Sequence, residues 1–529
     1  MDIPPIHEQE TAAAVLPFPE KTAPPQRIFD RIFSRHVLNM ALLLLIVMLM
    51  TRTLRMPDEL LADPDLWWHF ADARILTEAH HFIHVEPYSF TVAGQPWVNP
   101  EWLAELPYWF SYRILGLKGI YLFTALVLFA NLVFVYWRGY WTSRHAGAAF
   151  WAAGAGFLLM TVNAGARMIV IAYLLMSAEM AILEAAERGK TRLLWLLPPL
   201  FCVWINLHGS WLIGICLFAL YILCGLFTVE AGVFAQRAFS AADRNRLLQV
   251  LFASVAALFV NPYGWKLLWN PIDMAMYQRL SHATVQEWSP LSLSSLPGIG
   301  ALIVIFLTVI ANALCARKWK IYEMAFLLFA WFAAFDHSRF AFLAAVVIVP
   351  MLAGDLKRSF ISEPDTKTIP LMNCLMVVGS LCLVAFLIPT SAKLNTALGT
   401  VFPLKTIAAI QPSWRIFNAD AQGGMMNFQS KSTFIDSRFD TFDHHGVLRD
   451  YIDIMELRDS LNLMDKYRID HVLLPQAMSL SYLLERTPGW TVLRREGTGG
   501  ATFELFARVP GALPASNPRS PVPDQTGIR

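Results

Sequence analysis

The chain has 529 residues, of which 56% are hydrophobic and only 16% are charged, and its formal net charge is +2. So much apolar surface excludes an ordinary soluble protein, and so small a net charge gives no support to nucleic-acid binding. The composition predicts a polytopic α-helical membrane protein. All six cysteines lie in apolar segments, so no disulfide framework is predicted.

Residues 1–25 are rich in Pro, Ala and Glu without periodicity, which predicts a disordered cytoplasmic tail. Residues 26–390 form the predicted transmembrane domain, in which about eleven apolar runs approach the length that crosses a bilayer. The predicted spans are roughly 36–54, 119–137, 146–163, 168–186, 193–208, 210–228, 247–263, 297–316, 321–337, 339–354 and 369–389.

Basic residues occupy every second connection between these spans, on the same side as Arg27, Arg31 and Arg35. Because positive connections stay in the cytoplasm, the N-terminus is expected there. The first outer loop, residues 55–118, then lies on the outer side together with the 261–296 loop and the C-terminal domain.

The first outer loop is too polar to cross a bilayer, yet it carries many carboxylates and histidines. Asp65, His69 and Asp72 follow one another at i, i+4 and i+7, which places them on one face of a helix. A second surface helix is expected further along the loop, and its predicted N-cap and first turn are Asn99 and Pro100.

Five tryptophans also lie in this loop, and their amphipathic rings favour an aromatic belt at the membrane interface. They are Trp67, Trp68, Trp97, Trp102 and Trp109.

Residues 391–510 change character and predict a small α/β domain on the outer face. Short β-rich runs at 414–417, 432–435, 471–474, 490–494 and 502–509 alternate with helical patterns at 447–466 and 478–486. Asp436, Arg438 and Asp440 form an acid–base run on a predicted strand edge, for which a surface ion-pair set is at least as well supported as substrate contact. Residues 511–529 predict a second disordered tail.

Polar and ionisable residues gather at the span ends that the orientation places outside. Ionisable groups at membrane depth usually face protein or water, so these side chains are expected to point toward one cavity. Interfacial anchoring of each single residue is an equally good interpretation. The residues are Arg167, Asn206, His208, Asn261, Tyr263, Glu287, Asp336, His337 and Arg339.

Several short motifs together resemble the GT-C class of integral-membrane glycosyltransferases, and within it the bacterial mannosyltransferase-like members. The motifs are DPDLWWH (63–69), PYSFTVAGQPWVNPEWLAE (87–105), NLHGS (206–210), NPYGW (261–265), EWSP (287–290) and FIDSRFD (434–440). The resemblance implies a GT-C-like fold of about 11 transmembrane helices in the bacterial cytoplasmic (inner) membrane. It also implies a polyprenyl-phosphate-linked sugar donor and an acceptor hydroxyl, of a glycan, lipid or protein, that enters from the outer face.

In that class, the acidic residue that opens the first outer loop acts as the base, which implies this role for Asp65, with Asp63 beside it. Glu101 matches a second catalytic acid, helped by Glu105. With one base opposite the leaving group, single displacement with inversion is expected. The other expected substrate- and phosphate-binding residues are Asp63, His69, Glu105, Arg167, His208, Asn261, Tyr263, Glu287, His337 and Arg339.

The chain lacks the adjacent Asp-Glu pair of the better-studied members and has Asp65 and Leu66 there, with His69 one turn later. This leaves open whether a divalent cation, Mg or Mn, is used, with Asp65 and His69 as its candidate ligands. Two alternatives to a transferase remain. One is a transporter or flippase of a lipid-linked or polar solute, and the other is a non-catalytic membrane assembly protein.

Overall fold

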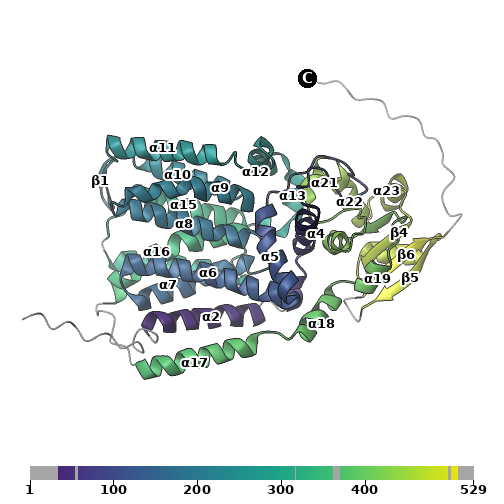
Figure 1. The fold of residues 1–529 in the computed structure, drawn as a ribbon, viewed down its shortest axis with the longest axis horizontal. Coiled ribbons are helices and arrows are strands. Elements are labelled where there is room, and N and C mark those ends of the chain that lie inside the picture. The colour runs from purple at the N-terminus through teal and green to yellow at the C-terminus, as the bar shows by residue number, and fades with distance from the viewer. Residues whose placement is uncertain (1–33, 54–56, 316, 362–369, 498–501, 510–529) are drawn as a thin grey trace, which may run out of the picture.

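The computed structural model describes residues 34–53, 57–315, 317–361, 370–497 and 502–509. The predicted tails at 1–25 and 511–529, and the basic residues Arg27 and Arg31, lie outside these ranges. A bundle of long helices forms one half of the molecule, and shorter helices with a small sheet form the other half (Figure 1). The helices α4 (Pro64–Ala79) and α5 (Trp102–Leu115) lie where the two halves meet.

Six of the described helical segments are long and apolar enough to cross a membrane, and a bent pair makes up to seven. The six contain α2 (Arg35–Thr53), α6 (Leu117–Ser143), α7 (Ala146–Met160), α8 (Ile169–Glu187), α14 (Leu296–Leu314) and α16 (Ala341–Phe360). The bent pair is α17 (Pro370–Leu387) and α18 (Ser391–Val401), which meet at 47°. The predicted mostly helical chain with several apolar helices long enough to cross a membrane is therefore confirmed.

The predicted count of about eleven spans is not confirmed, although a helix lies at each predicted position. The remaining four positions hold helices that are too short or too polar for the same criterion. They are α9 (Leu197–Leu207), which continues the 3-10 turn η2 (Thr191–Leu196), α10 (Trp211–Cys224), α11 (Ala241–Ala257) and α15 (Ile321–Asp336). The apolar run at 210–228 extends beyond both ends of α10, and the run at 247–263 extends beyond the end of α11 at Ala257.

The centre of the bundle is α16, most of whose 20 residues are buried. It packs on α6, α7, α14 and α15. A Cβ atom at Gly156 of α7 would lie 2.1 Å from Cγ2 of Val349, so a glycine is required for these two backbones to approach.

The connections carry short elements of their own. They are η1 (Thr161–Asn163), the hairpin β1 (Val229–Ala231) with β2 (Phe234–Gln236), α12 (Trp265–Tyr277), α13 (Arg279–Thr284), η3 (Gln286–Trp288) and η4 (Ser338–Phe340). The first outer loop contains α3 (Pro57–Leu61) besides α4 and α5.

The C-terminal half contains a four-stranded sheet of order β3-β4-β6-β5. β3 pairs with β4 in parallel, and the other neighbours are antiparallel. The strands are β3 (Ile416–Asn418), β4 (His471–Pro475), β5 (Trp490–Glu496) and β6 (Phe503–Arg508). The helices around them are α19 (Leu404–Ala409), α20 (Asp420–Phe428), α21 (Phe439–Asp443), α22 (Val447–Met455), α23 (Ser460–Lys466) and α24 (Ser479–Arg486).

Two predicted elements of this half are wrong. Residues 432–435 form no sheet strand, because Thr433 bonds instead to the first outer loop, donating its N–H to the Tyr88 carbonyl at 3.3 Å and accepting from the Phe90 N–H at 3.2 Å. The helix expected over 447–466 is broken between α22 and α23, where Leu457 has a φ of 62°. A left-handed residue ends an α-helix.

The aromatic-belt interpretation is wrong for four of the five loop tryptophans. The exposed fractions are 1% for Trp67, 7% for Trp68, 6% for Trp97 and 3% for Trp109. The Trp67 ring contacts the rings of Phe402 and Phe428 from the C-terminal half. These tryptophans therefore join the loop to the C-terminal half, where they are shielded from a headgroup layer.

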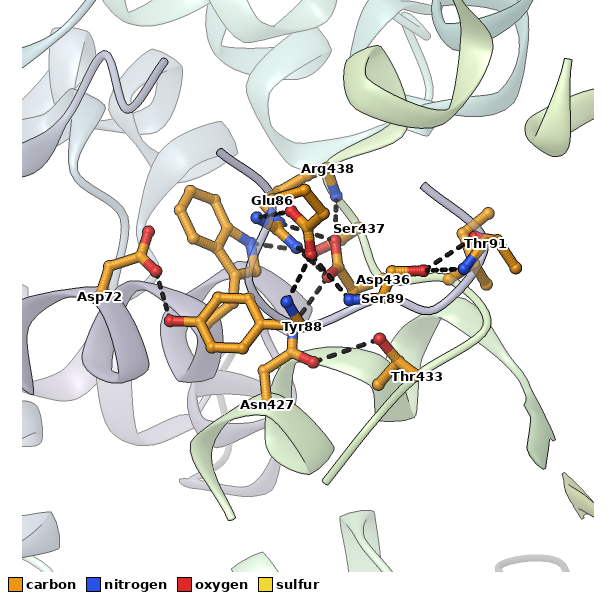
Figure 2. Close-up of polar contacts among 12 residues, drawn as sticks. Asp72, Glu86, Tyr88, Ser89, Thr91, Asn427, Thr433, Asp436, Ser437 and Arg438 are labelled. Carbon is orange, nitrogen blue, oxygen red and sulfur yellow. Dashed lines mark hydrogen bonds and ion pairs between the residues drawn. The ribbon is translucent and has the colours of Figure 1, made fainter. Parts of the chain in front are cut away.

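The predicted surface ion pairs of the FIDSRFD motif are also wrong, because Asp436 and Arg438 are buried. Figure 2 shows the polar contacts of these two residues. The Arg438 guanidinium pairs with Asp436 at 2.6 Å and, across the boundary between the two halves, with Glu86 of the loop at 2.7 Å. It also lies over the rings of Trp97 and Tyr88, at 4.8 and 5.2 Å from the centroids. Local sequence patterns do not reveal this ion pair, because Glu86 and Arg438 are far apart in the sequence.

Asp440, the third residue of the run, lies in α21 and is half-buried. Burial raises its pKa to about 6 against the opposing effect of Arg438.

Replacing Arg438 with Met should lower the free energy of unfolding by about 3–5 kcal/mol, because it leaves two buried carboxylates without their cation. Thermal unfolding of the purified protein in detergent measures this loss. Arg458→Met is the matched control, since Arg458 is 57% exposed and, among the described residues, forms ion pairs with Asp453 and Glu456 at the surface. Its effect should stay within about 0.5 kcal/mol. Equal unfolding temperatures for the two variants would contradict the structural role of Arg438.

Candidate active site

The helix α4 presents the predicted acidic face toward the interior of the molecule. Asp63 caps its N-terminus by accepting the Asp65 N–H at 3.0 Å, and Pro64 occupies the first turn, where no N–H is needed. α20 packs closely over this end: a Cβ atom at Gly424 would lie 2.2 Å from the Pro64 carbonyl oxygen. The expected helix is thus confirmed, and the C-terminal half fixes where it begins.

Asp65 is half-buried in the first turn of α4. One of its oxygens accepts the Trp68 indole N–H at 3.2 Å, and the same indole N–H lies 3.2 Å from the Ser437 hydroxyl. Burial and the neighbouring charge of Asp63 raise the pKa of Asp65, and they outweigh His69, a hydrogen bond from Ser437 and Arg167. A carboxylate with a raised pKa is a stronger base, which suits proton abstraction.

Arg167 lies beside this acidic pair. Its Nε donates to Asp63 at 2.7 Å, and its guanidinium also forms an ion pair with Glu287. One cation therefore joins the loop to the segments before α8 and around η3. Its charge is already balanced by two carboxylates.

His69 lies between two carboxylates one turn further along α4. Its Nδ1 is 2.8 Å from Glu105, and its Nε2 is 3.3 Å from Glu101. Burial lowers the pKa of His69, but hydrogen bonds and charge from Glu101 and Glu105 raise it to about 10. His69 is therefore an imidazolium at neutral pH and donates from both ring nitrogens.

Glu101 connects His69 to the end of α9. Its other oxygen lies 3.1 Å from Nε2 of His208, whose Nδ1 accepts the Ser210 N–H at 2.9 Å. Burial lowers the pKa of His208 to about 4 despite Glu101, with Arg339 and His69 adding to the effect. His208 is thus neutral and donates from Nε2, and both of its nitrogens are already engaged.

The pKa of Glu101 itself is lowered. Burial raises it, but the neighbouring His208 ring, the hydrogen bond and charge of His69, and the charge of Arg339 outweigh that effect. Glu101 is therefore ionised, and it holds the imidazole rings of His69 and His208 by one carboxylate oxygen each.

The predicted N-cap at Asn99 is wrong, because α5 begins at Trp102 and its N-cap is Glu101. Asn99 uses its carbonyl to accept the Glu101 N–H at 2.9 Å and its amide to bond Glu105 at 2.7 Å and Asp72 at 3.2 Å. Pro100 removes one donor just before this turn. The polar side chain of Asn99 thus belongs to the buried network, which the capping pattern did not reveal.

Asp72 completes the network by accepting from the Tyr88 hydroxyl at 2.5 Å (Figure 2). Burial, together with the charge of Glu105, raises the pKa of Asp72 well above its usual range. Burial likewise raises the pKa of Glu105. A proton held within this group of acids reduces their mutual repulsion.

Arg339 approaches the same centre from η4, within electrostatic range of Arg167, Glu101 and Asp65. Its guanidinium lies over the Trp288 ring, 4.6 Å from the centroid, and its Nε has no hydrogen-bond partner among the described residues. Arg339 therefore differs from Arg167, whose Nε donates to Asp63.

Three predicted site residues have other contacts. Asn261 closes a turn by accepting the Tyr263 N–H at 2.9 Å, and the Tyr263 ring packs against His84. The His337 ring lies edge-on to Trp288 and pairs with Asp336 at 3.0 Å. Asn261 and His337 therefore support neighbouring segments. Tyr263 lies closer to the network: burial raises its pKa, and the charges of Glu105 and Asp72 add to this effect.

The structure thus joins nine of the predicted residues in one network and adds Ser437, Asn99, Asp72 and Tyr88. Ser437 was present in the quoted FIDSRFD motif, but its proximity to Asp65 depends on tertiary structure. The nine are Asp63, Asp65, His69, Glu101, Glu105, Arg167, His208, Glu287 and Arg339.

A metal ion finds no ready ligand set in the described part of the chain, where no three His, Cys, Asp or Glu side chains are arranged to hold one. His69 uses both ring nitrogens on carboxylates. The divalent cation therefore stays a prediction, and no step below depends on it.

Comparisons with known proteins bear on the fold. No protein-family model matches the sequence, and no curated protein matches it. The crystal structure of the Archaeoglobus fulgidus oligosaccharyltransferase in the apo form has a TM-score of 0.53 at 12% identity, covering 83% of this chain and 69% of that one. The same enzyme tethered with an acceptor peptide that contains the NVT sequon gives 0.52 at 12% identity, covering 84% and 69%.

A third structure is the archaeal oligosaccharyltransferase AglB from A. fulgidus in complex with an inhibitory peptide and a dolichol-phosphate. It gives a TM-score of 0.52 at 10% identity, covering 90% of this chain and 75% of that one. Identities this low show likeness of fold alone. The chain is thus similar in fold to an archaeal oligosaccharyltransferase of the GT-C type, and the expected kind of fold is supported.

Proposed function

We propose that the protein is a membrane glycosyltransferase of GT-C type. It moves a sugar from a polyprenyl-phosphate-linked donor to an acceptor hydroxyl at the outer face of the membrane. The observation that carries the proposal is the meeting of a half-buried Asp65 with Arg167 and Arg339 at the loop end of the bundle. A base and a phosphate-binding cation in one site are the two groups that this reaction needs.

Asp65 is the proposed base. It takes the proton of the acceptor hydroxyl while that oxygen attacks the anomeric carbon and the bond from this carbon to the phosphate oxygen breaks. Asp63 cannot replace it as readily, because its two oxygens already hold the Asp65 N–H and Arg167. A single base opposite the leaving group gives inversion at the sugar.

Arg339 is the proposed ligand of the departing phosphate. The negative charge that develops on this group is stabilised by donors that are free to turn toward it. The Arg339 Nε has no hydrogen-bond partner among the described residues, whereas Arg167 is shared by Asp63 and Glu287, and His208 has both nitrogens engaged. His337 contributes by packing against Trp288, over which Arg339 lies.

Glu101 is proposed to act through its neighbours. It holds the imidazolium of His69 and the neutral ring of His208 in fixed positions, so that α4 and the end of α9 keep their distance across the site. Glu105 supports the other nitrogen of His69.

The donor class is supported by the structural neighbours, one of which holds a dolichol-phosphate. That compound is a polyprenyl phosphate, which corresponds to the leaving group of the proposed reaction. The acceptor peptide of another neighbour makes a protein one candidate acceptor here, beside a glycan or a lipid.

Replacing Asp65 with Asn should lower sugar transfer by about 10²- to 10⁴-fold, because the amide cannot take the acceptor's proton. Release of polyprenyl phosphate from a panel of lipid-linked sugars by the protein in lipid vesicles measures this. Glu78→Gln is the matched control: Glu78 lies on the same helix, is 56% exposed and pairs with the exposed Arg113. An Asp65→Asn variant that folds and remains fully active would overturn the assignment, and no Asp65-dependent release from any donor would favour a transporter or assembly protein.

The pH dependence of the rate of sugar transfer should reflect the raised pKa of Asp65. A base works in its ionised form, so the rate should rise with pH through a value above the usual aspartate range. Because the hydrogen bond from Ser437 lowers this pKa, Ser437→Ala should move the rising limb to higher pH.

Ser432→Ala serves as the control for that experiment, since the Ser432 hydroxyl bonds the Tyr88 carbonyl and not the acid. Its profile should match that of the wild type. A Ser437→Ala profile that keeps its position, or moves to lower pH, would show that Asp65 is not the titrating base.

A further inference from the structure

A second polar site lies at the opposite end of the bundle from α4, between the last turns of α6 and α8 and the first turns of α15. It is a cavity of about 220 Å³ that α16 closes from inside. In Figure 1 this end carries the β1 label, far from the C-terminal half. None of its lining residues belongs to the network around Asp65.

Charges of both signs line this cavity. The charged lining residues are Arg138, Glu184, Glu187, Arg188, Arg317, Lys320 and Glu323. Arg138 is only 2% exposed and pairs with one oxygen of Glu184 at 2.6 Å, and Lys320 pairs with Glu187. Buried charges remain in such places only when they are paired or meet a ligand.

Several polar groups of the cavity are not satisfied by the described residues. The second oxygen of Glu184 is buried without a hydrogen-bond partner. The Arg317 side chain is 8% exposed and its Nη2 pairs with Glu323 at 3.1 Å, but its Nε has no hydrogen-bond partner among the described residues and lies 3.6 Å from Asp355. Arg188 lies exposed at the rim and forms no ion pair within the described ranges. Acceptors and donors are thus both left over in one cavity.

The apolar part of the lining lies deeper in the bundle than the charges. On α8, Met180 and Leu183 precede Glu184 and Glu187, and α8 ends at this side. On α15, which begins at this side, Phe326 follows Glu323. The cavity is therefore charged at its mouth and apolar toward the middle of the bundle. A lipid has the same order of a charged headgroup and apolar acyl chains.

We propose that this cavity binds the headgroup of a zwitterionic phospholipid that carries a primary ammonium, namely phosphatidylethanolamine. The ammonium lies against the free oxygen of Glu184, the phosphate lies against Arg188 and Arg317, and the acyl chains follow the apolar side. The proposal is independent of the sugar-transfer reaction.

The mixed charges of the lining select this class of lipid. A purely anionic headgroup would meet three glutamates, and a purely cationic ligand would meet four cations, so either is repelled by part of the wall. A choline group carries no N–H donor, so it leaves the free oxygen of Glu184 unsatisfied. A primary ammonium has three donors and satisfies it.

The test is native mass spectrometry of the full-length protein, purified in detergent and titrated with phosphatidylethanolamine, phosphatidylcholine or phosphatidylglycerol of identical acyl chains. One phosphatidylethanolamine should remain bound with an affinity about tenfold above that of the other two lipids. Equal retention of all three, or preferential retention of phosphatidylglycerol, would overturn the proposal. Soluble phosphoethanolamine should compete only at much higher concentration, and displacement at equal concentration would show that a soluble ester is the ligand.

Arg188→Ala should weaken retention of phosphatidylethanolamine by about tenfold without affecting folding, because Arg188 is exposed. Glu184→Gln should abolish the preference over phosphatidylcholine, although it also weakens the pair with Arg138 and needs a check of thermal unfolding. Arg113→Ala is the control, an exposed arginine at the loop end of the bundle, and should bind as the wild type does. Retention that is unchanged in Arg188→Ala and Glu184→Gln would place the lipid elsewhere.

Discussion

A protonated histidine between two carboxylates holds the loop end of this molecule together. His69 lies on α4, Glu101 and Glu105 lie at the start of α5, and Glu101 continues to His208 at the end of α9. Each of these groups is costly to bury alone, and each becomes tolerable only beside the others. The position of α4, and with it the direction of Asp65, therefore depends on contacts that no single helix can supply.

The C-terminal half takes part in the same site, although it is remote in the sequence. Arg438 pairs with Glu86 across the boundary, and Ser437 beside it reaches Asp65. Three separate parts of the chain thus set the charge state of one carboxylate: the loop supplies it, the bundle brings Arg167, and the C-terminal half brings a hydroxyl. The tryptophans of the loop close this junction and keep water from the charged groups.

Local patterns in the sequence were sufficient to predict the helices of the bundle and the helix at Asp65, since each leaves a periodic or capping signal. Most residues of the network were expected from their position at the predicted outer span ends and from the resemblance to the GT-C class. Local patterns failed where tertiary contacts replaced local rules. Residues 432–435 have strand composition but bond to the loop, and Asn99 has the form of an N-cap but binds two buried acids. The alternation of charges at Asp436 and Arg438 indicated a surface, because their partner, Glu86, lies 352 residues from Arg438.

That separation has a consequence for the order in which the protein forms. Glu86 leaves the ribosome long before Arg438 is synthesised. Until Arg438 is present, the Glu86 carboxylate has to stay hydrated, which prevents the loop from closing over it. Contacts between distant residues form late because the intervening chain must first be ordered. The bundle can therefore insert helix by helix during synthesis, while the loop reaches its final shape only after translation of the C-terminal half. A nascent or truncated chain would occupy the membrane without a completed site.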